Sequence, residues 1–384
     1  MDARKLKDQF RLKHNRMNGS IREIVEIESP SFDPEGVTEV AEWIERRAGL
    51  VLPDAVIERT NVEGRGRHLV IRAFRDRPGE AVLVLGHIDT VHPRGSKEMN
   101  PTRIEDGRLY GCGTFDMKAN IALMLDVFEG MAEFGLSPAR PITILLTCDE
   151  EVGSETGRPL VEREAKRAEY CLILEPSAMG KVKTGRKGTG GYTLKARGIP
   201  AHAGLDPEKG ASAVLELSRQ IIELEKLNDP SVGTTVTVGT IKGGTTTNVV
   251  PEHAECSIDV RFTSIGEAEK IEKALSALEP FDSRVKLTLE GEINRPPLER
   301  TKAVEDLYDH ARMLAGSFGY DLGETQVGGA SDGNFVGALG VPVLDGLGIA
   351  GDGAHRLDEH VFVEDILNRA VLYTLLFTND LSKY

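Results

Sequence analysis

The segment Leu85-Gly-His87-Ile-Asp89-Thr-Val91 holds the pair of residues best suited to metal chemistry. It follows the apolar run 81–85, which predicts a buried strand that ends near the histidine. Side chains two residues apart on an extended chain point to the same side. Asp89 could therefore accept the second ring N–H of His87 and fix its tautomer, as a metal-binding histidine requires. A single pair of this kind is more often an ordinary hydrogen bond, so its meaning depends on further clusters.

Four more clusters of metal-binding residue types follow along the chain. They are centred on Asp116, Asp149-Glu150-Glu151, Glu175 and His355. In an open parallel sheet, ligand sites form outside the carboxyl ends of the strands. Acidic and imidazole side chains gathered there would stay poorly satisfied without cations. Two histidines and three carboxylates suit a pair of Zn²⁺ ions, each with an open position for water; Co²⁺ or Mn²⁺ would suit the same ligands.

Short apolar strands alternate with helices in the first part of the chain. We predict strands at 68–74, 81–85, 141–147 and 170–174, and helices at 17–30, 37–49, 119–134 and 158–168. This alternation is typical of an α/β fold with a doubly wound, mostly parallel sheet covered on both faces. The pattern resumes near the end of the chain, with helices at 302–316 and 363–379 and a strand at 341–344.

A different pattern occupies residues 187–293. We predict strands at 192–197, 234–241, 254–262 and 285–289, with helices at 211–227 and 265–278. Strand, helix, two strands, helix, strand is the split βαβ order of a small ferredoxin-like α+β domain. We therefore expect a discontinuous catalytic domain at 1–186 and 294–384 and an inserted domain at 187–293. Residues 294–297 are predicted as the linker that leaves the insertion.

Bulk properties exclude several classes of protein. At 384 residues the chain exceeds one ordinary core, which favours two domains. A net charge of −14 argues against nucleic acid or an anionic membrane surface as a partner. The four cysteines form no CxxC, so neither a disulfide framework nor a thiolate zinc site is expected, and Cys148 and Cys171 are interpreted as buried free thiols. No signal peptide or membrane-spanning run is apparent, which predicts a cytoplasmic protein.

Taken together and in order, the motifs resemble those of the M20 family of zinc aminopeptidases, carboxypeptidases and amide deacylases. The resemblance is greatest to the glutamate carboxypeptidase (carboxypeptidase G2-like) branch and extends from about residue 20 to 380. It is carried by His87-Ile-Asp-Thr-Val, Gly113-Thr-Phe-Asp-Met-Lys, Asp149-Glu-Glu, Glu175-Pro-Ser, Ala201-His-Ala-Gly204 and Gly328-Gly-Ala-Ser-Asp332.

The resemblance implies a ligand role for each matching residue. Asp116 would bridge two metal ions. His87 and Glu175 would complete one metal site, and Glu151 and His355 would complete the other.

The resemblance also implies the catalytic residues. Glu150 would be the general base and acid, and Asp89 would orient the first ligand histidine. Many deacylase branches carry aspartate where this chain has Glu175, which weakly favours a carboxypeptidase. Met117 stands where close relatives often have aspartate, and this difference is not expected to disturb the metal site.

Further implied residues concern the substrate and a partner subunit. His202 would reach the active site of a second subunit and stabilise the oxyanion, which implies a homodimer formed through the inserted domain. Arg261 would bind a substrate carboxylate, and Asn248 would contact substrate or oxyanion. Gly328 and Gly329 would let the backbone approach the ligand.

Each of these residues also has a plainer interpretation. His202 could be a loop histidine after a proline, and Asn248 an ordinary turn residue. Arg261 could be an exposed strand residue paired with Asp259 or Glu255.

The expected reaction is amide hydrolysis that releases a C-terminal amino acid, with glutamate as one candidate, from a peptidyl or N-acyl substrate. One alternative is an N-acyl amino acid deacylase of the acetylornithine or succinyl-diaminopimelate type, or a hydrolase of a non-peptide amide or amine. A remote alternative is a non-catalytic metal-dependent binding protein. The intact Glu150 argues against this last function, because a pure binder needs no proton shuttle.

Overall fold

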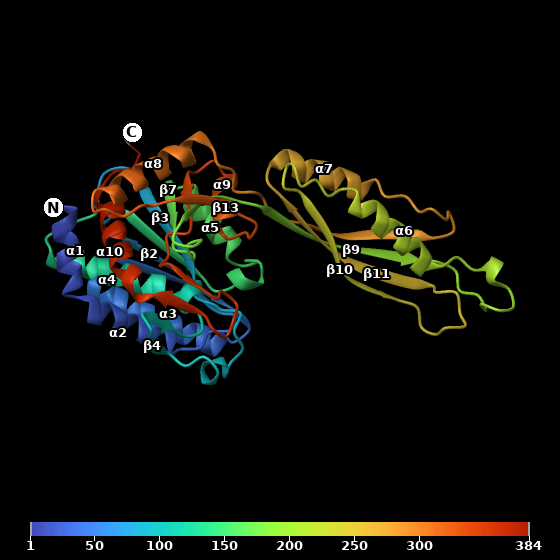
Figure 1. Ribbon diagram of the computed structural model, residues 1–384, viewed down its shortest axis with the longest axis horizontal. Coiled ribbons are helices and arrows are strands. Elements are labelled where there is room, and N and C mark those ends of the chain that lie inside the picture. Colours follow the sequence, from blue (N-terminus) through green and yellow to red (C-terminus); the bar gives the residue numbers. More distant parts are fainter. Residues whose placement is uncertain (1, 383–384) are drawn as a thin grey trace. The chain divides into compact units, whose positions relative to one another are not determined.

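The computed structural model describes residues 2–382 and divides into two compact units (Figure 1). The first comprises the chain up to Gly185, Arg300–Gln326 and the residues from Ser331 on. The second comprises Arg186–Glu299 with Val327–Ala330. The residues predicted as an insertion, 187–293, fall within this second unit.

A six-stranded sheet in the order β1-β2-β6-β3-β7-β14 forms the centre of the first unit. Neighbours from β6 to β14 are parallel, whereas β1 and β2 run antiparallel to their neighbours. This confirms the prediction of a mixed, mostly parallel sheet, although β1 was not predicted. The strands are β1 (Val56–Val62), β2 (Gly66–Ala73), β3 (Ala81–His87), β6 (Ile142–Thr147), β7 (Ala168–Ile173) and β14 (Val343–Leu344).

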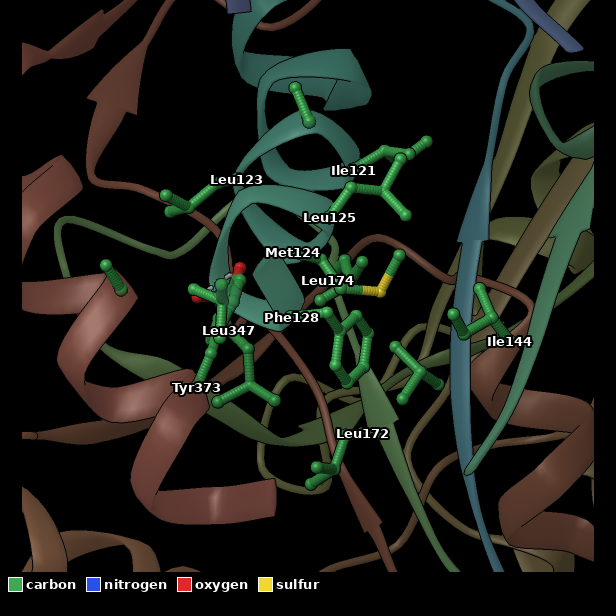
Figure 2. Close-up of a cluster of buried hydrophobic side chains, with 14 of the residues drawn as sticks. Ile121, Leu123, Met124, Leu125, Phe128, Ile144, Leu172, Leu174, Leu347 and Tyr373 are labelled. Carbon is green, nitrogen blue, oxygen red and sulfur yellow. Dashed lines mark hydrogen bonds between the residues drawn. The ribbon is translucent and has the colours of Figure 1, made fainter. Parts of the chain in front are cut away.

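Both faces of this sheet are covered because its central strands are apolar on both sides. Val82 and Val84 of β3 belong to the main core, and Leu83 and Leu85 between them are also buried. Figure 2 shows part of that core, where α4 packs beside β6 and β7. Helices α5 and α9 contact β7. The helices of this unit are α1 (Ala3–Arg11), α2 (His14–Val25), α3 (Pro34–Val51), α4 (Ala119–Glu133), α5 (Arg158–Ala165), α8 (Lys302–Gly316), α9 (Gly333–Ala338) and α10 (Val363–Thr378).

Helix α2 ends five residues before the predicted boundary at residue 30. A residue that precedes a proline disfavours the helical conformation, and Ser29 precedes Pro30. The carbonyl of Ser29 accepts instead the backbone N–H of Thr90, at 2.8 Å. This contact carries the segment after α2 alongside the loop that follows β3.

Two further small sheets were not predicted, and the four-stranded one is antiparallel. One has the order β15-β16-β5-β4, and the other pairs β13 with β8. Their strands are too short for a periodic pattern to reveal them. They are β4 (Arg103–Glu105), β5 (Arg108–Tyr110), β8 (Val182–Arg186), β13 (Glu324–Val327), β15 (Gly351–Asp352) and β16 (His360–Phe362).

The second unit is a four-stranded antiparallel sheet in the order β10-β11-β9-β12, with two helices. The chain order of strand, helix, two strands, helix and strand confirms the predicted α+β arrangement. The elements are β9 (Gly188–Arg197), α6 (Ala213–Glu225), β10 (Thr235–Gly243), β11 (His253–Phe262), α7 (Ile265–Ser276) and β12 (Lys286–Arg295). The predicted linker at 294–297 was partly wrong, because β12 continues to Arg295 against β9.

All four cysteines are free and buried, as predicted for Cys148 and Cys171. Within residues 2–382, none of the helices has both the length and the apolar character needed to cross a lipid bilayer.

Candidate metal centre

Three adjacent parallel strands carry most of the predicted ligands. β3 lies between β6 and β7, and His87 is its last residue. Glu150 and Glu151 begin the short turn after β6, and Glu175 follows just beyond the end of β7. The carboxyl ends of parallel strands meet at one edge of a sheet, so these side chains converge on His87.

Two groups of possible ligands share the imidazole of His87. The donor atoms of His87, Glu150 and Glu175 all lie within 4.8 Å of one another. The same holds for His87, Asp116 and Glu151. The convergence predicted at the sheet edge is therefore present in the fold, and it includes Glu150, which we had predicted as the base and not as a ligand.

The two nitrogens of His87 face different partners. Nε2 lies 3.0 Å from Oδ1 of Asp116 and 3.7 Å from Oε1 of Glu175. Nδ1 lies 3.0 Å from the backbone oxygen of Asp89 and 3.5 Å from its Oδ1. The nearer partner of Nδ1 is thus the main chain of Asp89, whereas the sequence predicted its carboxylate. In either case the contact directs Nε2 towards the acidic cluster.

Asp116 presents one carboxylate oxygen to each of two histidines. It lies in the helical turn Thr114–Lys118 that leads into α4. Its Oδ1 faces His87, and its Oδ2 lies 3.4 Å from Nε2 of His355. The same nitrogen of His355 lies 3.2 Å from Oε2 of Glu151. A carboxylate held between two imidazoles in this way has the arrangement that a bridging metal ligand needs.

Charges in the cluster perturb one another strongly. Burial alone would raise the pKa of Asp116, but hydrogen bonds with His355 and His87 outweigh it and hold that pKa well below its usual range. Contacts with Asp116 and Glu151 raise the pKa of His355 to about 10. Burial, followed by repulsion from Asp116, raises the pKa of Glu151. The negative charge of these acidic side chains thus stabilises positive charge on the groups beside them.

One buried oxygen atom indicates that the site suits a cation. Oε1 of Glu151 is buried and has no hydrogen-bond partner among residues 2–382. Leaving a buried carboxylate oxygen unpaired is costly. Carboxylate and imidazole donors are those that Zn²⁺, Co²⁺ and Mn²⁺ accept. The residues present therefore fit a divalent metal, which would satisfy this oxygen and balance the acidic charge.

Asp89 does more than accompany His87. Its Oδ1 accepts the backbone N–H of Glu150 at 3.2 Å, and its Oδ2 accepts that of Glu151 at 3.3 Å. Oδ2 also accepts the hydroxyl of Ser31 at 2.7 Å. The buried carboxylate therefore ties the loop after β3 to the turn after β6. The spacing of His87 and Asp89 along the chain did not reveal this second role.

A second network, built on the buried side chains of Asp149 and His68, supports the same acidic turn, and the sequence did not reveal it. Oδ2 of Asp149 accepts the backbone N–H and the hydroxyl of Thr156, both at 2.7 Å. The Thr156 hydroxyl lies 2.9 Å from Nε2 of His68, whose Nδ1 accepts the N–H of Cys148. Burial lowers the pKa of His68, which favours the neutral ring that this pattern needs. His68 thus has a structural role, and it supports this turn.

The remaining predicted residues belong to the second unit. His202 and Asn248 lie on neighbouring loops, because the N–H of Ala203 donates to the carbonyl of Asn248 at 2.9 Å and His202 bridges to Val249. Gly328 and Gly329 lie in the segment Val327–Ala330, which belongs to the second unit. The carbonyl of Gly329 accepts a hydrogen bond from Nη1 of Arg186 at 3.2 Å.

Arg261 of β11 pairs with Asp259 two residues earlier. Its Nε donates to Oδ1 and its Nη2 to Oδ2, each at 2.9 Å. This is the pairing that the plainer interpretation anticipated. Nη1 makes no hydrogen bond to residues 2–382, so the edge formed by Nη1 and Nη2 remains able to receive a second carboxylate.

Comparison with known proteins places these motifs in a family. The model of peptidase family M20/M25/M40 matches residues 83–379, more than half of the chain. This chain belongs to that family. It is 28% identical over 358 residues to carboxypeptidase G2 of Pseudomonas sp. (strain RS-16), covering 88% of this chain and 82% of the relative. It is 30% identical over 349 residues to succinyl-diaminopimelate desuccinylase of Dechloromonas aromatica (strain RCB), covering 83% and 90%.

Solved structures share the fold of this M20 chain. Aminopeptidase PepT from Bacillus cereus ATCC 10987 superimposes with a TM-score of 0.79 at 23% identity, covering 95% of this chain and 98% of that one. An M20 family metallo-carboxypeptidase from Sulfolobus solfataricus gives 0.71 at 15% identity, covering 94% and 98%. With its family membership, the chain is an M20 metallohydrolase, and the predicted enzyme class is confirmed.

Proposed function

We propose that this M20 metallohydrolase uses two zinc ions to cleave an amide bond and release a C-terminal amino acid from a peptidyl or N-acyl substrate. His87, Asp116, Glu151, Glu175 and His355 would be the ligands. The proposal rests on the position of Glu150, whose donor atom lies within 4.8 Å of those of His87 and Glu175. Beside it, the carboxylate of Asp116 faces both His87 and His355. Carboxypeptidase G2 is among the relatives at 28% identity.

In this proposal Glu150 carries the proton and the other side chains hold their positions. A bound metal pair would polarise the amide carbonyl and lower the pKa of water to about 7. Glu150 would take the proton from water and pass it to the departing nitrogen. Asp89 would keep the backbone of Glu150 and Glu151 fixed through its two N–H contacts. One of the adjacent acids can then bind metal while the other shuttles the proton.

The leaving amino acid would be recognised by Arg261. Asp259 occupies the Nε and Nη2 side of the guanidinium and orients it, while the Nη1 side is available. A planar guanidinium can bind two carboxylates through two different edges. Glutamate is the first leaving group to test, because the sequence motifs resemble those of the glutamate carboxypeptidase branch.

Arg261→Lys is expected to raise KM for N-acyl-glutamate substrates about 10- to 100-fold, since a hydrogen bond to a charged group contributes about 1.5–3 kcal/mol. Lysine keeps the charge but loses the second donor edge. Arg284→Lys is the matched control, because Arg284 pairs with Asp282 at the same two-residue spacing in the same unit. Initial rates with wild type and both variants check the effect. An unchanged KM in Arg261→Lys would refute the recognition role.

A second candidate function is amide deacylation, which the succinyl-diaminopimelate desuccinylase relatives favour at 28–30% identity. Both functions would use the same metal centre, since specificity resides in the substrate contacts. The two differ in which side of the amide carries the recognised carboxylate. Rates on an aromatic N-acyl-glutamate and on an N-succinyl amine distinguish them, and preference for the succinyl substrate would replace the carboxypeptidase proposal.

We further propose a homodimer formed through the second unit, with His202 stabilising the oxyanion in the partner's active site. β10 is an edge strand whose only partner among residues 2–382 is β11. Helix α6, which contacts β10, exposes Leu215 and Ile222 at 52% and 62%. These residues are seven apart and share one face of the helix. An open edge beside an apolar helix face is a surface that a second copy would cover.

The double substitution Leu215→Asp/Ile222→Asp is expected to weaken self-association about 30-fold or more, as loss of central apolar contacts in an interface does. Activity should fall with the dimer, because His202 would act across the interface. Met313→Asp is the control, since Met313 is 60% exposed on α8 of the first unit. Light scattering across a concentration series checks the assembly. A double variant that still forms dimers would contradict this interface.

A further inference from the structure

Glu359 is a fully buried carboxylate that no predicted role includes. It follows the ligand candidate His355 by four residues and is 0% exposed. Its Oε1 accepts the backbone N–H groups of Phe115 and Asp116, at 2.7 and 2.8 Å. Its Oε2 accepts the N–H of Gly113 at 2.7 Å. The carboxylate therefore holds three backbone donors of the turn that presents Asp116.

The shape of this turn depends on those contacts. Gly113 adopts φ +73°, and a Cβ there would lie 2.6 Å from Cε of Lys118 and 2.7 Å from Cγ2 of Thr90. The glycine lets its N–H point inward with the next donors, which makes a nest of backbone N–H groups around one anion. Asp116 itself has non-helical angles within the turn, φ −120° and ψ 88°. Glu359 accepts the N–H groups of Phe115 and Asp116 in this irregular turn, and these contacts hold its shape.

His92 holds the carboxylate from the other side. Its Nε2 lies 2.6 Å from Oε2 of Glu359, and the side chain is buried. The main chain of Glu359 is also fixed, because its carbonyl accepts the side-chain amide of Asn100 at 3.2 Å and the N–H of Gly111 at 3.3 Å. One residue thus links three segments: the loop after β3, the turn of Asp116 and the loop of His355.

We propose that Glu359 is a positioning residue of the metal centre, and that its carboxylate, held by His92, fixes the distance between Asp116 and His355. The inference rests on the proposed metal-dependent function. It deepens that function, because it assigns the preorganisation of the bridging ligand to a residue that touches neither substrate nor metal. Residues that orient metal ligands typically change metal affinity about 10- to 100-fold when replaced.

Glu359→Gln is the decisive variant because glutamine has the same size and shape. Its amide nitrogen, a hydrogen-bond donor, would face two other donors, the N–H of Gly113 and the imidazole of His92, so both hydrogen bonds would be lost. We expect Zn²⁺ affinity to fall about 10- to 100-fold, measured by competition with a chromophoric chelator below the unfolding temperature. Thermal unfolding of each chelator-treated protein is measured in parallel, so that a loss of folding is recognised.

Glu164→Gln is the matched control for loss of a buried carboxylate. Glu164 is 3% exposed and pairs with Arg72 and Arg163, outside the metal cluster. Its replacement is expected to lower stability while Zn²⁺ affinity stays within about twofold of wild type. Equal losses of affinity in Glu359→Gln and Glu164→Gln would overturn the proposal, as would an unchanged affinity in Glu359→Gln.

His92 provides the second test, which decides the matter if Glu359→Gln does not fold. His92→Ala is expected to weaken Zn²⁺ binding, and His92→Gln is expected to restore part of it, because glutamine can still donate to Glu359. An affinity in His92→Ala equal to that of wild type would overturn the proposal. A wild-type chain that binds no Zn²⁺, Co²⁺ or Mn²⁺ would instead refute the proposed metal-dependent function itself.

Discussion

Glu150→Gln is expected to lower kcat for amide hydrolysis by about 10²- to 10⁴-fold, the usual contribution of a general acid–base residue. Glutamine keeps the size of the side chain but cannot accept a proton. The backbone contact from Glu150 to Asp89 does not involve the side chain and should persist. The substitution therefore isolates proton transfer from the shape of the turn. Single-turnover rates on an N-acyl-glutamate substrate check the result.

The metal content of the variant distinguishes whether Glu150 acts as a base or as a metal ligand. It could be a ligand because its donor atom lies close to those of His87 and Glu175. A base that does not bind metal leaves the metal content of Glu150→Gln equal to that of wild type. Loss of one metal equivalent would identify Glu150 as a ligand and contradict the proposed role. Glu155→Gln is the control, because this exposed residue lies in the same loop. It should keep full activity.

Removal of metal by exhaustive chelation is expected to lower kcat/KM by about 10³-fold or more, since metal ions contribute several kcal/mol to transition-state stabilisation. Two equivalents of Zn²⁺ per chain should restore the activity. Asp116→Asn should not recover in the same way. The amide nitrogen cannot replace the carboxylate oxygens that face His87 and His355.

Asp126→Asn is the control for this second experiment. Asp126 is a buried carboxylate of α4 that pairs with Arg47 and Ser20, and it is not among the candidate metal ligands. Its substitution should leave the metal stoichiometry unchanged. Full activity in wild-type protein after all metal has been removed would contradict a metal-dependent mechanism.

Much of the fold followed from local patterns along the chain. β3, β6 and β7 are continuous apolar runs, and α4 is a longer apolar run after a glycine-rich turn, so their positions were predicted to within about two residues. β1 was missed because its residues are only partly buried and its pattern is polar. The short strands around His355 carry too few residues for any period to show. Short and half-exposed elements are defined by their partners, which a local pattern does not contain.

The sequence by itself determined which candidate metal-binding residues stand at the ends of β3, β6 and β7, because strand ends and residue types are local properties. It also determined the family, through the order of the motifs. Only the tertiary structure decided how those side chains are held. Glu359 accepts a hydrogen bond from a residue 244 positions earlier, and Asp89 from residues 61 and 62 positions later. Contacts between segments so far apart depend on how the chain packs, and no spacing along the sequence encodes them.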